Sequence, residues 1–181
     1  MKATPNPAFK RDCRKARQPL NFTLGVKEMD PTFIATPSES AISAALSVWP
    51  ELASRRIRPL LVTAFGDIYV ETDAGEVLAA KPIELECVRV CGSVEELQQL
   101  FSDAKWAEEN LITNLALLAK ERGTTRQHHQ VFAFAPHPSL TGKLRVENLM
   151  PMDINVWHHI CSQLRGAQQG APGDAPKAAR P

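Results

Sequence analysis

Residues 58–80 decide the fold, and they read Arg58-Pro-Leu-Leu-Val-Thr-Ala-Phe-Gly-Asp-Ile-Tyr-Val-Glu-Thr-Asp-Ala-Gly-Glu-Val-Leu-Ala-Ala80. Residues 60–65 form a short apolar run with β-branched members, which predicts a buried strand. Gly66-Asp67 predicts a kink, residues 68–72 continue extended, and residues 73–75 predict a turn. Residues 76–80 then return as the hairpin partner, so we expect an antiparallel meander.

The segments on either side of this meander predict helices and one more strand. Thr36-Pro37-Ser38-Glu39 is typical of a helix start with Thr36 as the cap, and Pro50 either interrupts this helix or opens a short second one. Successive side chains of residues 84–91 would point to opposite sides of a strand, and neither side is cleanly polar. This favours a strand whose faces are mostly covered by other parts of the protein. Ser93-Val-Glu-Glu96 predicts a capping box at the start of the next helix.

The C-terminal part predicts a further helix, a strand pair and a last helix. Ser102 or Asp103 is expected to cap a helix that ends at Gly123. Its inward side chains are expected to be Trp106, Leu111, Leu115 and Leu118. Strands are expected at residues 130–134 and 143–146, around a turn bracketed by Pro136 and Pro138, and Asp153 is expected to open the final helix.

This order of elements predicts an α+β fold, with a mainly antiparallel sheet packed with about four helices in a single domain. Residues 1–20 are expected to form a disordered basic leader, and residues 21–165 the folded domain. Residues 166–181 are rich in Gly, Ala, Gln and Pro and are expected to be a disordered low-complexity tail.

The formal net charge of +1 conceals an uneven distribution of charge. Residues 61–110 hold three Lys/Arg against eleven Asp/Glu, a sum of −8, whereas residues 1–60 sum to +5 and residues 111–181 to +4. An acidic centre repels phosphates and attracts basic partners. We therefore expect no direct binding of nucleic acid.

The compartment follows from two absences in the sequence. There is no apolar run long enough to span a membrane and no apolar stretch of a secretory signal near Met1. We therefore expect a cytoplasmic protein without membrane contact. Its four cysteines (Cys13, Cys87, Cys91 and Cys161) are expected to stay thiols, most of them packed in the core.

Catalytic motifs are missing from the chain. It contains no G-x-G-x-x-G, G-x-x-x-x-G-K-[ST], G-x-S-x-G or H-E-x-x-H pattern. We therefore expect a binding protein with no cofactor and no metal, not an enzyme.

Two weaker chemical alternatives stay open. A metal site would combine His158 and Cys161, which are three residues apart on the last helix, with two more ligands from His128, His129 or Cys87. The adjacent histidines match no zinc-ligand spacing. A Cys–His nucleophile would pair Cys91 or Cys161 with His158 or His129.

Several separate blocks of residues occur in a characteristic order along the chain. The first are Trp49-Pro50, Arg58 to Val70 and Gly75-Glu-Val77. The later blocks are Cys91-x-Ser93-x-Glu95-Glu96-Leu97, Phe134-x-Pro136-x-Pro138-x-Leu140-Thr-Gly-Lys143, Val146-Glu-Asn148, Asp153 and Val156-Trp157 to Gln163-Leu164. These blocks resemble a bacterial domain family that includes the immunity proteins of type VI secreted DNase toxins. The resemblance covers about residues 45–165, whereas residues 20–45 are shorter than the helical module that family members often carry there.

A second, short resemblance concerns the leader. Pro5-Asn-Pro-Ala-Phe-Lys-Arg11 is similar to translated repeats that border mobile bacterial gene cassettes. It implies that the gene travels between genomes and that the leader is an accident of reading frame.

The family resemblance implies an immunity protein that binds a cognate toxin, such as a DNase, in the cytoplasm and blocks it without catalysis. Because a DNase presents a basic face to phosphates, we expect carboxylates of the inhibitor to meet that face. The expected partner-binding residues are Asp67, Glu71, Asp73, Glu76, Glu84 and Glu86. The alternatives are an orphan cassette-borne enzyme with a Cys/His site and a housekeeping protein-interaction domain, and the oligomeric state is left open.

Overall fold

The structure is a computed structural model, and it describes residues 30–127 and 129–170. The predicted leader, Cys13, His128 and the end of the predicted tail lie outside the described residues. None of the described helices is both long enough and apolar enough to cross a lipid bilayer.

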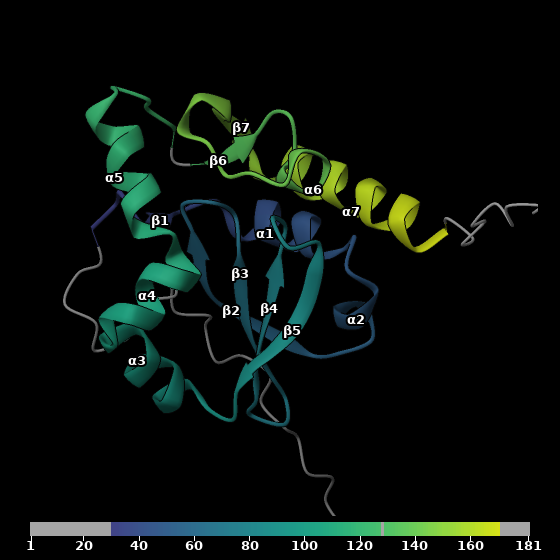
Figure 1. The fold of residues 1–181 in the computed structure, drawn as a ribbon. Coiled ribbons are helices and arrows are strands. Elements are labelled where there is room, and N and C mark those ends of the chain that lie inside the picture. Colours follow the sequence, from purple (N-terminus) through teal and green to yellow (C-terminus); the bar gives the residue numbers. More distant parts are fainter. Residues whose placement is uncertain (1–29, 128, 171–181) are drawn as a thin grey trace, which may run out of the picture.

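A five-stranded antiparallel sheet forms the centre of the fold (Figure 1). Its strands, in spatial order, are β1 (Ile34–Ala35), β2 (Ile57–Thr63), β3 (Ile68–Thr72), β4 (Val77–Lys81) and β5 (Glu86–Cys91). Strands β2 to β5 follow one another along the chain, which confirms the predicted meander. The predicted kink is also confirmed, because Gly66 has a φ of +95° between β2 and β3.

A second, two-stranded sheet pairs β6 (Gln130–Phe134) with β7 (Leu149–Asp153). The predicted strand at residues 143–146 is therefore wrong. Those residues run exposed into the 3-10 turn η1 (Val146–Asn148), and the strand follows it. Pro151 argues against a central strand in the sequence, but a proline is tolerated in β7 because this strand has only β6 as its neighbour.

In the described part of the chain, seven α-helices surround the sheets. This is more than the sequence predicts, because two predicted helices are split and one turn is helical. They are α1 (Glu39–Leu46), α2 (Pro50–Ala53), α3 (Val94–Ser102), α4 (Ala104–Leu111), α5 (Thr113–Glu121), α6 (Pro138–Thr141) and α7 (Ile154–Gly170). Ile112 separates α4 from α5 with a left-handed φ of 52°. Helix α7 runs to Gly170 and so extends past the predicted end of the domain at residue 165.

The helix caps and inner faces match the sequence only in part. The cap of α1 is Ser38, which accepts from the N–H of Ala41 at 3.2 Å, and not Thr36. Ser93 caps α3 as predicted. Leu118 was expected inward but is 43% exposed, because the break at Ile112 turns Ala116 and Ala119 into the core instead.

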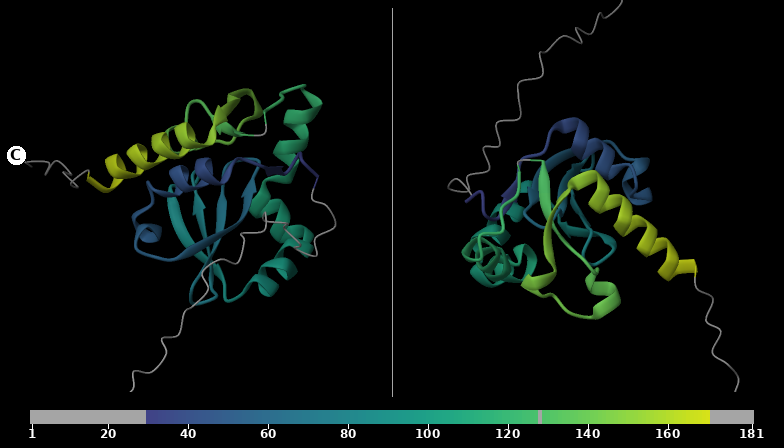
Figure 2. Two further views of the ribbon diagram at one scale, coloured as in Figure 1. Left: turned by 180° about the vertical axis from the view of Figure 1, so that it is seen from behind. Right: turned by 90° about the horizontal axis from the view of Figure 1, so that it is seen from above.

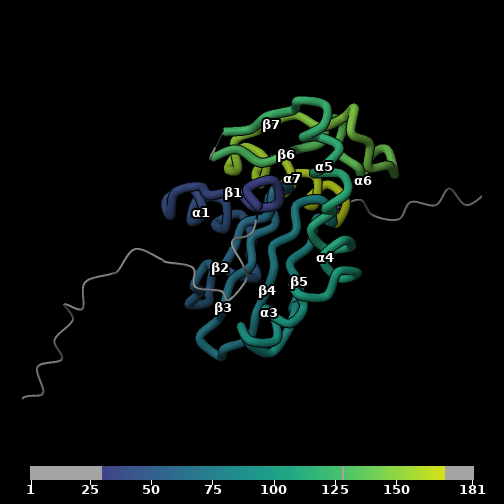
Figure 3. Tube along the Cα trace, turned by 90° about the vertical axis from the view of Figure 1, so that its left-hand side faces the viewer, coloured from purple at the N-terminus to yellow at the C-terminus, as the bar shows by residue number. Residues whose placement is uncertain are grey.

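Each face of the five-stranded sheet carries its own apolar core. On β3 the side chains alternate, so Ile68 and Val70 join the larger cluster while Tyr69 joins a smaller one with Leu97 and Phe101. Helices α3 and α4 lie on one side of the sheet and α1 on the other, and α7 and the β6–β7 pair form an upper layer (Figures 2 and 3).

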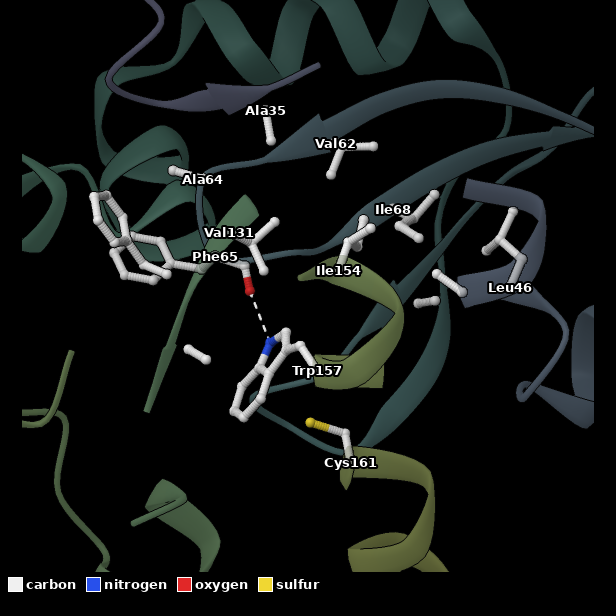
Figure 4. Packing of buried hydrophobic residues seen from close by; sticks show 14 of the residues in the cluster. Ala35, Leu46, Val62, Ala64, Phe65, Ile68, Val131, Ile154, Trp157 and Cys161 are labelled. Carbon is white, nitrogen blue, oxygen red and sulfur yellow. Dashed lines mark hydrogen bonds between the residues drawn. The ribbon is translucent and has the colours of Figure 1, made fainter. Parts of the chain in front are cut away.

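Helix α7 is fixed to the turn between β2 and β3 by two buried aromatic side chains. The indole N–H of Trp157 donates to the carbonyl oxygen of Phe65 at 3.1 Å (Figure 4). A Cβ at Gly66 would lie 2.9 Å from Cδ1 of Trp157, so this close approach requires glycine.

His158 makes the second link of this turn to α7. The indole N–H of Trp49 donates to its Nδ1 at 2.8 Å, and its Nε2–H donates to the carbonyl oxygen of Gly66 at 2.8 Å. Burial lowers the pKa of His158 to about 4, so the ring is neutral at physiological pH. Both ring nitrogens therefore take part in hydrogen bonds within the core.

Replacing His158 by alanine should lower the free energy of unfolding by about 2–4 kcal/mol, because the Trp49 N–H and the Gly66 carbonyl lose their partners inside the core. The neighbouring His159→Ala is the matched control, since His159 is exposed and should cost less than about 0.5 kcal/mol. Urea unfolding followed by circular dichroism measures both. Equal effects of the two substitutions would contradict this role.

Candidate partner-binding surface

The structure divides the six predicted carboxylates between two ends of the sheet. Glu71, Asp73 and Glu76 lie at the β3–β4 turn, whereas Asp67, Glu84 and Glu86 lie at the opposite end, beside the β4–β5 turn. Asp67 and Glu71 are four residues apart along extended chain, which corresponds to about 13 Å. The six residues therefore do not form one patch.

The carboxylates at the β3–β4 turn are interleaved with arginines. Arg58 donates to Glu71 through Nε and Nη2 at 2.8 and 2.5 Å. Glu76 accepts from Arg55 at 2.8 Å and lies 3.1 Å from Arg89. Asp73 is exposed and has no ion-pair partner among the described residues. This end of the sheet is thus a surface of mixed charge, not an acidic one.

At the opposite end, two carboxylates reach solvent. Glu86 is exposed and makes no ion pair within the part of the chain that the structure describes. Glu84 is also exposed and lies 3.7 Å from the ammonium group of Lys81. Lys81 in turn donates to the side-chain oxygen of Asn110 on α4 at 3.1 Å.

Asp67 differs from the other five because it is only 3% exposed. Its Oδ2 accepts from the hydroxyl of Thr63 at 3.2 Å, while its Oδ1 has no hydrogen-bond partner, and neither has the hydroxyl of the buried Tyr69. Burial raises the pKa of Asp67 to about 7, the charge of Glu84 adds to the rise, and Lys81 opposes it. A sealed side chain of this kind does not touch a partner. Of the other five, Asp73, Glu84 and Glu86 are exposed, and Glu71 and Glu76 are half-buried.

Replacing Asp67 by asparagine should stabilise the fold at alkaline pH. The folded-state pKa of Asp67 is raised above its ordinary value of 3.8, so its stabilising effect is complete below about pH 4 and is lost as pH rises through about 7. Asp67→Asn should therefore raise the free energy of unfolding at pH 8 by on the order of 2 kcal/mol and flatten its decline between pH 4 and 8.

Urea unfolding at a series of pH values measures this change, with Asp73→Asn as the exposed control. An unchanged pH dependence in Asp67→Asn would show that Asp67 is ionised in the fold at neutral pH.

No hydrogen bond joins a cysteine to a histidine among the described residues, although Cys161 and His158 lie one turn apart on α7. Cys91 packs in the smaller cluster, where its Sγ donates to the carbonyl oxygen of Ser93 at 3.2 Å, whereas His158 lies in the larger one across the sheet. Burial raises the pKa of Cys91 and of Cys161, and raises that of Cys87 to about 11. A raised pKa keeps a thiol protonated and weakly nucleophilic.

The metal alternative gains no support from the described residues, among which no three His, Cys, Asp or Glu side chains gather closely enough to hold an ion. His158 is engaged with Trp49 and Gly66, and His137 with Pro82 and Ser139. Because His128 lies outside the described residues, the part of the hypothesis that uses it stays a prediction.

A pocket of about 650 Å³ lies between β1, the chain before it, and α5. Its wall includes Arg126, which donates to the carbonyl oxygens of Pro31, Ile34 and Gln130. Lys120, also in the wall, donates to Thr32. These cations hold the chain before β1 against α5 and β6, and they are not aimed at a ligand.

The large apolar side chains that face solvent are a feature that the sequence reasoning missed. They all belong to the later part of the described chain: Leu117, Leu118, Leu140, Leu144, Met150, Val156 and Ile160. Leu118 was expected to face inward, and Leu140 and Val156 entered only the family resemblance, so none of the seven was predicted to face solvent.

This same part of the chain is similar to a known family. Residues 92–165 match the family model described as T6SS immunity protein Tdi1, C-terminal, where T6SS denotes the type VI secretion system. No curated protein matches the chain. The family match confirms the resemblance to type VI immunity proteins predicted from the sequence blocks.

Proposed function

We propose, from the match of residues 92–165 to a T6SS immunity-protein family, that this chain binds a cognate secreted toxin and neutralises it by covering its surface. The family match is the observation that carries the proposal. It implies recognition of another protein rather than conversion of a substrate.

The matched segment acts together with the sheet that precedes it. Trp157 and His158 lie inside the match, while their hydrogen-bond partners Phe65, Gly66 and Trp49 lie before it. Cutting the chain at residue 92 would therefore expose the larger core. We propose that residues 30–165 form the smallest unit that binds the toxin.

Electrostatics favour a basic partner such as a DNase. The described residues contain 12 Lys/Arg and 17 Asp/Glu, a net charge of −5. Because the whole chain carries +1, the remaining residues carry +6. A nuclease attracts phosphate groups with a basic surface, and an acidic inhibitor is drawn to the same surface and associates fast. We propose that the exposed Asp73 and Glu86 contribute most directly.

Three further predicted carboxylates would contact the toxin only after leaving the ion pairs that they form within this chain. Glu71 lies near Arg58, and Glu76 lies near Arg55 and Arg89. Glu84 lies near Lys81. Exposed ion pairs of this kind contribute little to stability, so basic groups of a toxin can replace these partners at small cost. Asp67 takes no direct part.

We also propose a cytoplasmic location, where a toxin that enters the cell would be met. Cys87, Cys91 and Cys161 are free thiols in the described structure, which fits a reducing compartment. The cassette origin of residues 5–11 stays a prediction.

Protection of living cells tests the immunity role. The secreted-toxin gene nearest to this gene in its source genome is expressed in a laboratory bacterium with and without this chain. The proposal predicts growth only when both are present, and a complex of the two purified proteins. Growth arrest despite abundant folded protein, with no complex, would reject the role and leave the two alternatives, a housekeeping interaction domain and an enzyme with a Cys/His site.

Reversing the exposed charges should slow association with the toxin. Asp73→Lys with Glu86→Lys is expected to lower the association rate by about tenfold at low ionic strength, and the difference should shrink near 0.5 M salt because charges are screened. Glu39→Lys with Glu121→Lys makes the same change of net charge at exposed positions elsewhere. Stopped-flow or surface-binding kinetics measures the rates, and equal slowing in both pairs would assign the effect to net charge alone.

A further inference from the structure

The segment Ser139–Arg145 is exposed at every position, although it contains two leucines. Leu140 is 66% exposed, the highest value among the exposed large apolar side chains, and Leu144 is 46% exposed. The segment belongs to the connection between β6 and β7, here called the anchored loop (residues 135–148). Figure 3 shows its helix α6 at the outer margin of the upper layer.

The neck of the anchored loop is closed by the second sheet. Phe134 pairs with Leu149, and the N–H of Ala135 donates to the carbonyl oxygen of Asn148 at 2.9 Å. The two ends of the loop are therefore held side by side, as in compact surface loops that often carry function.

The base of the loop is held by His137, which is buried. Its Nε2–H donates to the carbonyl oxygen of Pro82 at 3.1 Å, and its Nδ1 accepts from the N–H of Ser139 at 3.0 Å. The ring lies 5.3 Å from that of Trp157. The neutral form satisfies both bonds, and burial lowers the pKa of His137 and so favours that form.

The shape of the loop tip is set by its own hydrogen bonds. The N–H of Leu140 donates to the carbonyl oxygen of His137 at 3.0 Å, and the N–H of Gly142 donates to that of Pro138 at 2.6 Å. Gly142 ends α6 with a φ of +67°, a conformation that favours glycine. These bonds therefore hold the leucines on an ordered loop before binding, so that binding costs less conformational entropy.

Two cations accompany the leucines at the tip. Lys143 and Arg145 are exposed and make no ion pair within the described ranges, while Glu147 is already paired with Arg122 at 2.8 Å. Lys143, Leu144 and Arg145 are consecutive in exposed, non-helical chain, so the apolar and the charged side chains lie close together. The tip thus combines apolar anchors with two cations, although the charge of Arg145 also acts on the nearby Glu147, in a body whose described residues sum to −5.

We propose that the anchored loop inserts into a recess of the cognate toxin, with Leu140 and Leu144 against apolar walls and Lys143 and Arg145 against carboxylates at its rim. This inference rests on the proposed function and names the contact that carries it. The carboxylates that bind divalent metal ions in nucleases have the required chemistry, and they lie beside basic groups that suit the acidic body. Addition of a toxin strand to β7 is disfavoured instead, because Pro151 interrupts its free edge.

Removing the apolar anchors tests the proposal. The probe is the toxin from the neighbouring gene, in a form with its activity abolished, and calorimetry or surface binding gives Kd. Leu140→Ser with Leu144→Ser is expected to raise Kd by at least about 100-fold, since serine lacks the apolar surface that each leucine would bury against the toxin. The matched control is Leu117→Ser with Leu118→Ser on α5, whose side chains are 40% and 43% exposed, and it should change Kd by less than about threefold.

The cations are tested separately. Lys143→Glu with Arg145→Glu should weaken binding most at low salt, and hydrogen exchange should show protection at residues 139–145 in the wild-type complex. All these positions are exposed, so the melting temperatures of the variants should stay within about 2 °C of the wild type.

The outcomes separate the two proposals. If the wild type binds the toxin and the loop variants bind equally well, the loop is not the contact although the immunity role stands. If the wild type does not bind the toxin, the proposed function fails, and the loop inference fails with it. If the free wild type forms a dimer that Leu140→Ser with Leu144→Ser dissociates, the loop contacts a second copy and the inference is overturned.

Discussion

The attachment of helix α7 to the turn at Gly66 is the constraint on which the rest of the structure depends. Trp157 and His158 reach across to the carbonyl oxygens of Phe65 and Gly66, and His158 also holds Trp49 at the start of α2. These bonds join α7 to the first turn of the sheet meander. Because Trp157 also stacks near His137, the same helix supports the base of the anchored loop. The core and the proposed contact are thus parts of one arrangement.

The charge of the molecule is divided between surfaces of different kinds. The described body is acidic overall, yet Glu71 and Glu76 at the β3–β4 turn are paired with arginines, and the tip of the anchored loop is cationic and apolar. A uniformly basic partner would suit only the body. A toxin whose basic surface surrounds a small acidic recess would suit both, with the body attracting it over long range and the loop fixing its position at contact.

The meander could be predicted because its signals are local. Period-two alternation, Gly66 and the turn at residues 73–75 lie in consecutive residues, and the structure places strands close to the predicted bounds. The second strand of the β6–β7 pair could not be found in this way. Lys143 to Val146 alternates like a strand but has no neighbour to pair with, whereas Leu149–Asp153 contains a proline and is a strand because β6 lies beside it.

The candidate surface was harder to predict because it depends on contacts between distant residues. The pairing of Arg58 with Glu71 follows from the β2–β3 register, and the burial of Asp67 follows from its place near Tyr69 beneath the helices. The outward position of Leu140 and Leu144 follows from the anchoring of His137 to Pro82, residues that lie far apart in the sequence. The pattern of residues along the sequence does not show these contacts between distant residues.

The central claim is that the protein neutralises its toxin by occupying it and transforms nothing. The most direct measurement is a titration of toxin activity with increasing amounts of this protein at concentrations well above Kd. Occupation predicts that activity falls in a straight line, ends at an equimolar ratio and returns when the two proteins are separated by denaturation and refolding. Loss of all activity at a small fraction of equimolar protein, growing with time and surviving separation, would show catalysis and contradict the claim.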